Sequence, residues 1–191
     1  MLLNLTIDEA SDVIESTDII RQDRVIPGHF RPCAESPYPA GYDWVYRYEQ
    51  TLAAFLQPRM KSLPPDLVGE NSLLHEALVN AYCHAHHRDR LAPIVVTVLM
   101  GRNGFVIQVA DRGKGFNLQK VYRHYRKKRR YLTAVGDGIR RMAETDRYGV
   151  FYNPKGTEFH LLHLFDENLN ERLADRFAVA PESRAEMAEA H

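Results

Sequence analysis

Residues 75 to 87, HEALVNAYCHAHH, gather many chemically capable side chains into little more than three helical turns. The stretch holds four histidines, a cysteine, a glutamate and an asparagine. Imidazole and thiolate groups are the usual ligands of zinc, whereas carboxylate and carboxamide oxygens suit Mg²⁺. The composition of the stretch is therefore compatible with a zinc site, a magnesium site or simply the polar face of a helix.

The angular spacing of these residues shows which of them share a face. An α-helix turns by about 100° per residue. One polar stripe is then formed by Glu76, Asn80, Cys83, His84 and His87. The opposite side, which we expect to face the core, is formed by Leu74, Leu78, Ala81 and Ala85. The stripe by itself predicts only an amphipathic helix.

A zinc site built from these residues lacks the required spacing. Position 79 is valine, so the motif His-Glu-x-x-His is incomplete. Cys83 and His87 lie one turn apart, but no second pair of ligands has a matching spacing. We therefore interpret His75, His86 and His87 as surface residues, and Cys83 as either a packing residue or a bystander.

Glu76 and Asn80, also one turn apart, suggest a different chemistry. A carboxamide oxygen can ligate Mg²⁺, and a carboxylate can deprotonate a hydroxyl or a water. This chemistry needs a phosphate nearby, and two glycine turns follow downstream. In DRGKGF, residues 111–116, the glycines permit close approach to a flat ligand, and Asp111 can accept from an exocyclic amine. In AVGDGIRRM, residues 134–142, two glycines open a helix whose N–H groups and dipole favour phosphate.

The elements that must position these residues follow from periodicity and turn signals. We expect an acidic helix at 6–20, an edge strand within 23–30, a proline-rich loop and a helix at 44–60. A long helix at 67–87, capped by Asp66 or Asn71, carries the opening stretch. Strands are expected at 93–100, 105–111, 147–153 and 156–165, with a helix starting near 136 between the two pairs. Helices before and between antiparallel hairpins predict an α+β two-layer sandwich.

Length, composition and charge narrow the class of protein. A chain of 191 residues with 45% hydrophobic residues fits a single globular domain, and no apolar run approaches the length of a membrane span. The N-terminus lacks signal-peptide features, which predicts a cytoplasmic protein. A formal net charge of zero argues against general nucleic-acid or membrane binding. A cationic run, RHYRKKRR at 123–130, lies between acid-rich termini and is either a solvated face or a contact for phosphate or a partner.

Four segments in order complete a family resemblance. EALVNAYCHA, DRGKGF, GDGI and GTEFHL resemble the N, G1, G2 and G3 boxes of the gyrase, histidine-kinase and MutL (GHKL) ATPase superfamily, over about residues 66–165. The first box is most similar to that of the anti-sigma-factor serine/threonine kinases. The resemblance implies the Bergerat ATP-binding fold, with a mixed, mostly antiparallel sheet and helices on one face. It also implies an N-terminal extension at 1–40, an ATP-binding domain at 41–165 and an acidic helical tail at 166–191.

The resemblance also implies a role for each matched residue, with ATP and Mg²⁺ as cofactors. Glu76 would be the general base, and Asn80 would ligate Mg²⁺ between the phosphates. Asp111 would accept from the adenine amine, supported by Thr157 through water. Residues 116–135 would form a lid over the nucleotide. The nucleotide-binding set as a whole would comprise Asn80, His84, Asp111, Gly113, Gly115, Phe116, Gly136, Gly138, Ile139 and Thr157.

The function that the resemblance implies is a switch kinase that phosphorylates a STAS-type anti-anti-sigma protein and sequesters a sigma factor or another regulator, as a homodimer. Asp137 in the second glycine turn departs from the family, because a carboxylate beside a triphosphate is repulsive. It favours an alternative, a nucleotide-gated or non-catalytic binding module of the same fold. The ATP-binding domain of a two-component histidine kinase is a further alternative. That reading needs a phospho-accepting histidine upstream, where His29 is the sole histidine before His75.

Overall fold

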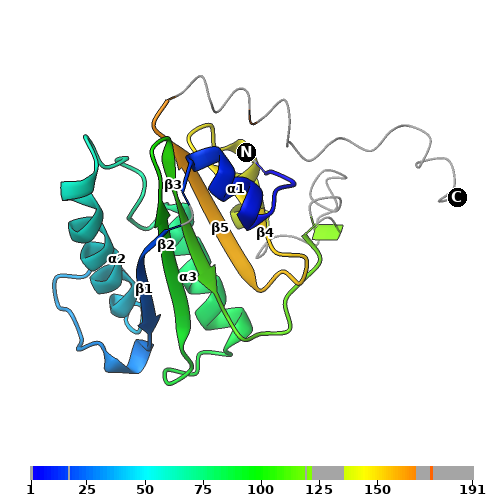
Figure 1. The fold of residues 1–191 in the computed structure, drawn as a ribbon. Helices are drawn as coiled ribbons and strands as arrows, with labels where there is room; N and C mark the ends of the chain where they lie inside the picture. Colours follow the sequence, from blue (N-terminus) through cyan, green and yellow to red (C-terminus); the bar gives the residue numbers. More distant parts are fainter. Residues whose placement is uncertain (1, 17, 119, 122–135, 167–172, 174–191) are drawn as a thin grey trace, which may run out of the picture.

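The computed structural model describes residues 2–16, 18–118, 120–121, 136–166 and 173. Five strands form one sheet in the order β1-β2-β3-β5-β4 (Figure 1). Their bounds are β1 Ile19–Val25, β2 Ile94–Met100, β3 Gly104–Ala110, β4 Gly149–Tyr152 and β5 Glu158–Leu164. All four pairings between these strands are antiparallel. The described parallel contact is a single bridge between Leu2 and Val150, so the sheet itself is not mixed.

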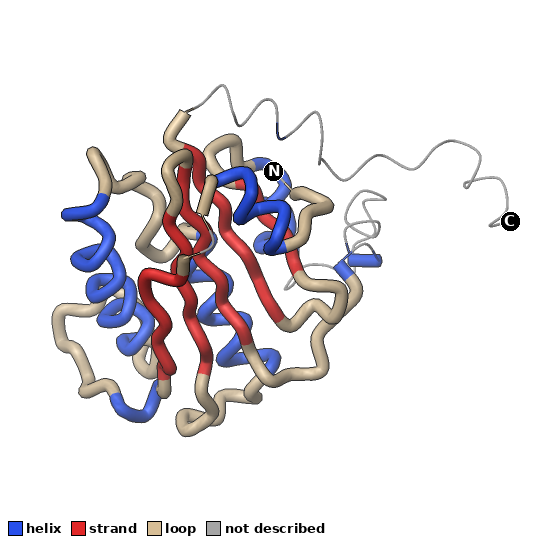
Figure 2. The backbone as a smooth tube through the Cα atoms, in the orientation of Figure 1, coloured by secondary structure: helices blue, strands red, loops and turns tan. Residues whose placement is uncertain are grey.

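The sheet is covered on both faces (Figure 2). Helices α2 (Asp43–Leu56) and α3 (Leu73–Asn80) pack on one face over the larger core, and α5 (Gly136–Glu144) packs against α3. Helix α1 (Ile7–Ile14) lies on the opposite face with the second apolar cluster. Coverage of both faces explains why β2 is apolar at nearly every position. The expectation that the helices share one face is therefore wrong for α1.

The beginning of the chain folds differently from its predicted boundaries. Helix α1 starts with a capping box, in which Thr6 accepts from the Glu9 N–H, and it ends at Glu15 in the left-handed conformation. The expected helix to residue 20 is too long, because residues from Ile19 onward pair with β2 at the edge of the sheet. The strand expected within 23–30 thus begins earlier, and Pro27–His29 form a short 3-10 helix, η1.

Helix α2 follows its predicted pattern, and a 3-10 turn, η2 (Gln57–Arg59), continues it. Its apolar stripe, with Trp44, Leu52 and Leu56 fully buried, is confirmed as a core face. The β2–β3 hairpin is also confirmed, because the Gly101 N–H donates to the Gly104 carbonyl at 2.9 Å. Within the described ranges, no helix has the length and apolar character needed to cross a bilayer.

The long helix expected at 67–87 is two shorter elements. Helix α3 begins at Leu73, capped by the Ser72 hydroxyl, which accepts from the His75 N–H at 2.9 Å. Asp66 and Asn71 are not its caps, and Gly69, at φ 114, lies in the turns that precede it. After Asn80 the backbone widens into a π-helix, η3 (Ala81–Ala85). Its hydrogen bonds span five residues, as in the bond from the His86 N–H to the Ala81 carbonyl at 3.1 Å.

Three predicted features lie outside the described residues. These are most of the expected lid at 116–135, the cationic run at 123–130 and nearly all of the acidic tail at 166–191. Residues 1–40 contribute α1, which packs on the sheet, and β1, which pairs with β2 at its edge.

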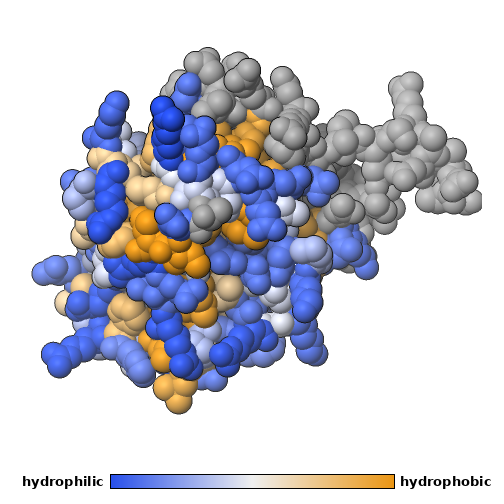
Figure 3. All heavy atoms as spheres, in the orientation of Figure 1, coloured by the Kyte–Doolittle hydropathy of each residue, from blue (hydrophilic) through white to orange (hydrophobic). Residues whose placement is uncertain are grey.

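On the surface in Figure 3, which is viewed from the α1 side, apolar side chains gather near the middle and are surrounded by hydrophilic ones.

Candidate functional site

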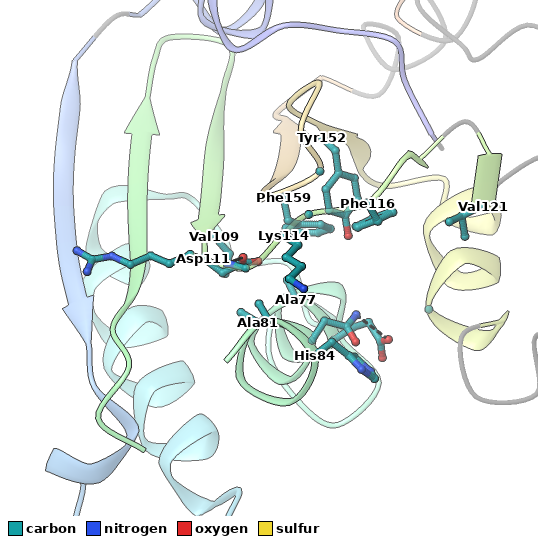
Figure 4. Close-up of a pocket in the computed structure, with 18 of the residues that line it drawn as sticks. Ala77, Ala81, His84, Val109, Asp111, Lys114, Phe116, Val121, Tyr152 and Phe159 are labelled. Atoms are coloured by element: carbon teal, nitrogen blue, oxygen red, sulfur yellow. Dashed lines mark hydrogen bonds between the residues drawn. The ribbon is translucent and has the colours of Figure 1, made fainter. Parts of the chain in front are cut away.

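A cavity of about 570 Å³ opens between α3, η3, the start of α5 and the ends of β3, β4 and β5. This volume is in the range of small-molecule sites. Side chains from α3, η3, β3, β4 and β5 converge on it (Figure 4), and Gly138 and Met142 line it from α5. Eight of the residues predicted from sequence line the cavity: Glu76, Asn80, His84, Asp111, Gly113, Gly115, Phe116 and Gly138.

Glu76 and Asn80 form one end of the cavity. They lie one turn apart on α3, and the Asn80 Nδ2 donates to Glu76 Oε1 at 3.1 Å. This hydrogen bond uses the amide nitrogen of Asn80 and leaves its oxygen available to a cation. Gly138, near the start of α5, packs directly on Glu76, since a Cβ there would collide with the carboxylate. The helix start and the carboxylate are therefore held together.

Asp111 lies toward the other end, because the turn that it begins packs through Gly113 on Ala85, nine residues along the chain from Glu76. Its backbone N–H donates to the Thr157 carbonyl at 3.0 Å, and its Oδ1 accepts from the Gly113 N–H at 2.7 Å. The second carboxylate oxygen remains available to a ligand. Burial raises the pKa of Asp111 above its ordinary value, and the hydrogen bond from Gly113 opposes that effect. Beside it, Val109 and Phe159 supply apolar walls.

The glycines of the first turn allow the loop to pack this closely. A Cβ on Gly113 would lie 2.6 Å from the Ala85 Cβ, so the loop touches η3 directly. Gly115 has φ 67, which is a strained conformation for other residues. A Cβ there would also collide with the Lys155 carbonyl. The spacing Asp-x-Gly-x-Gly thus serves backbone contacts on two sides of the cavity.

Thr157 and most of the second glycine turn are not among the described residues that line the cavity. Thr157 does not line the cavity; it donates its N–H to Asn153 Oδ1 at 2.9 Å and braces Asp111 through its carbonyl. Gly136 and Ile139 belong to α5, but their surroundings are not among those described, and the same holds for the side chain of Asp137.

The π-helix changes which residues of HEALVNAYCHAHH face the cavity. Ala81 and Ala85, expected on the core side, both line the cavity. His86, expected at the surface, is buried and accepts from the Arg112 N–H at 3.2 Å. His75 is also mostly buried, with its side chain 13% exposed and its ring against Tyr38. The surface prediction is therefore wrong for both histidines, whereas His87 is exposed.

The zinc interpretation gains no support. Among the residues that the structure describes, no three His, Cys, Asp or Glu side chains lie close enough to hold a metal ion together. Cys83 instead contacts the Tyr42 hydroxyl at 3.2 Å, and both cysteines are free. Of the two roles expected for Cys83, packing agrees with this contact.

Sequence reasoning missed several residues that line the cavity. Lys114 stands between the two glycines of the first turn, and Figure 4 shows its side chain reaching into the cavity. Tyr152 and Met142 line it from β4 and α5. The position of Lys114 within the glycine turn is a signal that could have found it. No comparable signal marks Tyr152, because an aromatic residue ending a strand is ordinary core.

No protein-family model matches the chain, and no curated protein matches it at a significant level. The functional conclusion therefore depends on the residues and geometry described above.

Proposed function

We propose that this protein binds Mg-ATP in the cavity and acts as a serine/threonine switch kinase with the Bergerat fold of the GHKL superfamily. The observation that supports this most is the pairing of two chemically distinct ends in one cavity. An available carboxylate oxygen of Asp111 lies beside apolar walls, and Glu76 and Asn80 lie at the opposite end under the start of a helix.

The Asp111 end fits a purine base that carries an exocyclic amine. The amine donates to the carboxylate, and Val109, Phe159 and Ala81 cover the flat faces of the ring. Because Gly113 already occupies Oδ1, the base is held by the remaining oxygen. Adenine has such an amine, which is why ATP is the proposed nucleotide.

The Glu76 end fits Mg²⁺ and phosphates. The amide oxygen of Asn80 would ligate Mg²⁺, which when bound neutralises charge on the phosphates. Glu76 accepts the proton of a partner's serine or threonine hydroxyl. The hydroxyl oxygen then forms a bond to the γ-phosphorus, the bond to the β–γ bridging oxygen breaks, and ADP leaves. Gly138 keeps this carboxylate in place.

The partner is proposed to be a STAS-type anti-anti-sigma protein, with a sigma factor or another regulator bound in the alternative state. A homodimer and a cytoplasmic location belong to the same proposal. The sequence resemblance in four ordered boxes supports these assignments, which go further than the chemistry of the cavity.

The first experiment is calorimetric titration with ATP, with and without Mg²⁺. We expect binding that strengthens with Mg²⁺ and is lost in Asp111→Ala. Absence of ATP binding at millimolar nucleotide would overturn the proposal.

The second experiment measures transfer from γ-labelled ATP to a purified STAS-domain protein of the proposed partner class. Glu76→Ala should abolish transfer and retain ATP binding. It removes the carboxylate that accepts the hydroxyl proton and leaves the adenine-binding end at Asp111 intact. Glu70→Gln is the matched control, since Glu70 is exposed and does not line the cavity. Binding without transfer in the natural chain would favour the nucleotide-gated binding module.

A further inference from the structure

Tyr152 is the last residue of β4, and its ring projects into the cavity between Phe116 and Phe159 (Figure 4). The ring meets Phe116 edge to face at 4.9 Å and Phe159 at 5.5 Å, so its orientation is fixed by two aromatic neighbours. Its hydroxyl therefore has a defined position in the cavity.

The hydroxyl of Tyr152 has a poor partner in the structure. It donates to the Met142 sulfur at 3.9 Å, and a thioether is a weak acceptor. Other tyrosines in the described core donate to carboxylates: Tyr48 to Asp23 at 2.9 Å and Tyr148 to Asp66 at 3.0 Å. Tyr152 thus keeps hydrogen-bonding capacity for a ligand.

The position of Tyr152 lies between the two ends of the cavity. Val109, Phe159 and Tyr152 are paired side by side across β3, β5 and β4. Neighbouring strands lie about 4.8 Å apart, so the backbone of Tyr152 is roughly 10 Å from that of Val109, which flanks the base end. On the other side, the Tyr152 hydroxyl contacts Met142, which is one turn beyond Gly138 on α5, and Gly138 packs on Glu76. The part of a nucleotide between base and phosphates is the sugar.

Tyr152 also remains a donor at physiological pH. Burial raises the pKa of the phenol above its ordinary value, and the charges of Glu76 and Asp111 raise it further. A neutral phenol beside an ordinary sugar hydroxyl can both donate and accept a hydrogen bond.

On this geometry we propose that Tyr152 is a specificity-determining residue that hydrogen-bonds the ribose hydroxyls of the bound nucleotide. The inference rests on the proposed binding of ATP and adds selection for the sugar. This hydrogen bond would allow the cavity to discriminate ribonucleotides from nucleotides whose sugar lacks both the 2′ and 3′ hydroxyls.

The test is a double-mutant cycle between protein and ligand. The dissociation constants of ATP and 2′,3′-dideoxy-ATP are measured for the natural chain and for Tyr152→Phe. We expect Tyr152→Phe to weaken ATP binding about three- to tenfold, the range of one neutral hydrogen bond. It should leave dideoxy-ATP binding unchanged, because that ligand never forms the contact.

Tyr148→Phe is the matched control, since Tyr148 does not line the cavity and bonds Asp66 instead. It should leave both dissociation constants unchanged, and circular dichroism melts verify that each variant is folded. The inference would be overturned if Tyr152→Phe lost affinity equally for both nucleotides, or lost none for ATP. In either case, ATP binding by the natural chain would still uphold the proposed function. Absence of ATP binding by the natural chain would overturn both.

Discussion

At the scale of single residues, Asp111 carries the clearest functional prediction. Asp111→Asn preserves the size of the side chain but replaces one acceptor oxygen with a donor. If the amide oxygen keeps the contact with the Gly113 N–H, the amide nitrogen faces the amine of the base. We expect the affinity for ATP to fall about 10- to 100-fold, the range of a hydrogen bond to a charged group. Calorimetric titration measures the loss.

Asp89→Asn is the control for this substitution, because Asp89 is exposed and outside the cavity. Its affinity for ATP should match that of the natural chain. Equal affinity in Asp111→Asn and Asp89→Asn would show that Asp111 does not hold the base.

The sequence identified the residues whose types are unusual for their setting. A carboxylate after an apolar strand, the two glycines that follow it and a Glu–Asn pair one turn apart on a helix all have a chemical reason to be noticed. Tyr152 and Met142 could not be found in this way. Their place in the cavity depends on which strands are neighbours, and that order is a property of the folded sheet.

At the scale of elements, the start of α3 depends on a buried carboxylate. Glu49 of α2 is fully buried and accepts from the Gly69 N–H at 3.3 Å, from the Ser72 hydroxyl at 3.4 Å and from the Tyr38 hydroxyl. Ser72 in turn caps the helix that carries Glu76. The proline-rich loop, α2 and α3 are thus joined through the side chain of Glu49.

We expect Ser72→Ala to lower the free energy of unfolding by about 1 kcal/mol or more, because it removes both the cap and a partner of Glu49. Urea denaturation measures the change. Ser62→Ala, at an exposed position before the cap, is the control. A loss no larger than that of the control would mean that the cap contributes nothing to stability.

Helix positions were predictable from sequence where a single period holds, as in α2. The predicted helix boundaries around α3 were wrong for two physical reasons. Gly69 and the hydrogen bonds to Glu49 hold residues before Leu73 in turns, and the π-helix after Asn80 adds a residue to one turn. Neither the buried partner nor the extra residue leaves a mark in the periodicity of apolar residues.

At the scale of the whole molecule, two buried groups give opposite dependences on pH. Burial raises the pKa of Glu49 from 4.5 to about 7, so its contribution to stability is complete below pH 4.5 and is lost as the pH rises to about 7. Burial lowers the pKa of His160, which stacks on Phe151, from 6.5 to about 4. Its contribution is complete above pH 6.5 and is lost as the pH falls to about 4.

The two slopes offset each other between pH 4.5 and 6.5. Relative to the natural chain, Glu49→Gln should gain stability as the pH rises through this window, and His160→Phe should lose it. Each change is on the order of 3 kcal/mol over the full shift. Denaturant titrations across the window measure the differences, and profiles parallel to that of the natural chain would contradict the prediction.

The fold as a whole was predictable in its strands and less so in its layers. Four of the five strands follow from alternation and hairpin signals, because each lies in a run of β-branched and aromatic residues. The placement of α1 on the second face could not be predicted, since its apolar side fits either face of the sheet. That choice depends on the second apolar cluster, to which Leu162 of β5 and Leu3 contribute.

The π-helix lies between two parts of the cavity wall that are anchored to different elements. Upstream of it, Glu76 and Asn80 are anchored through Ser72 to α2. Downstream, Ala85 and His86 are anchored to the turn at Arg112 and Gly113. If a nucleotide binds as proposed, we expect a shift of the turn at Arg112 and Gly113 to be taken up by the widened turn at residues 81–85, which leaves Glu76 in its alignment.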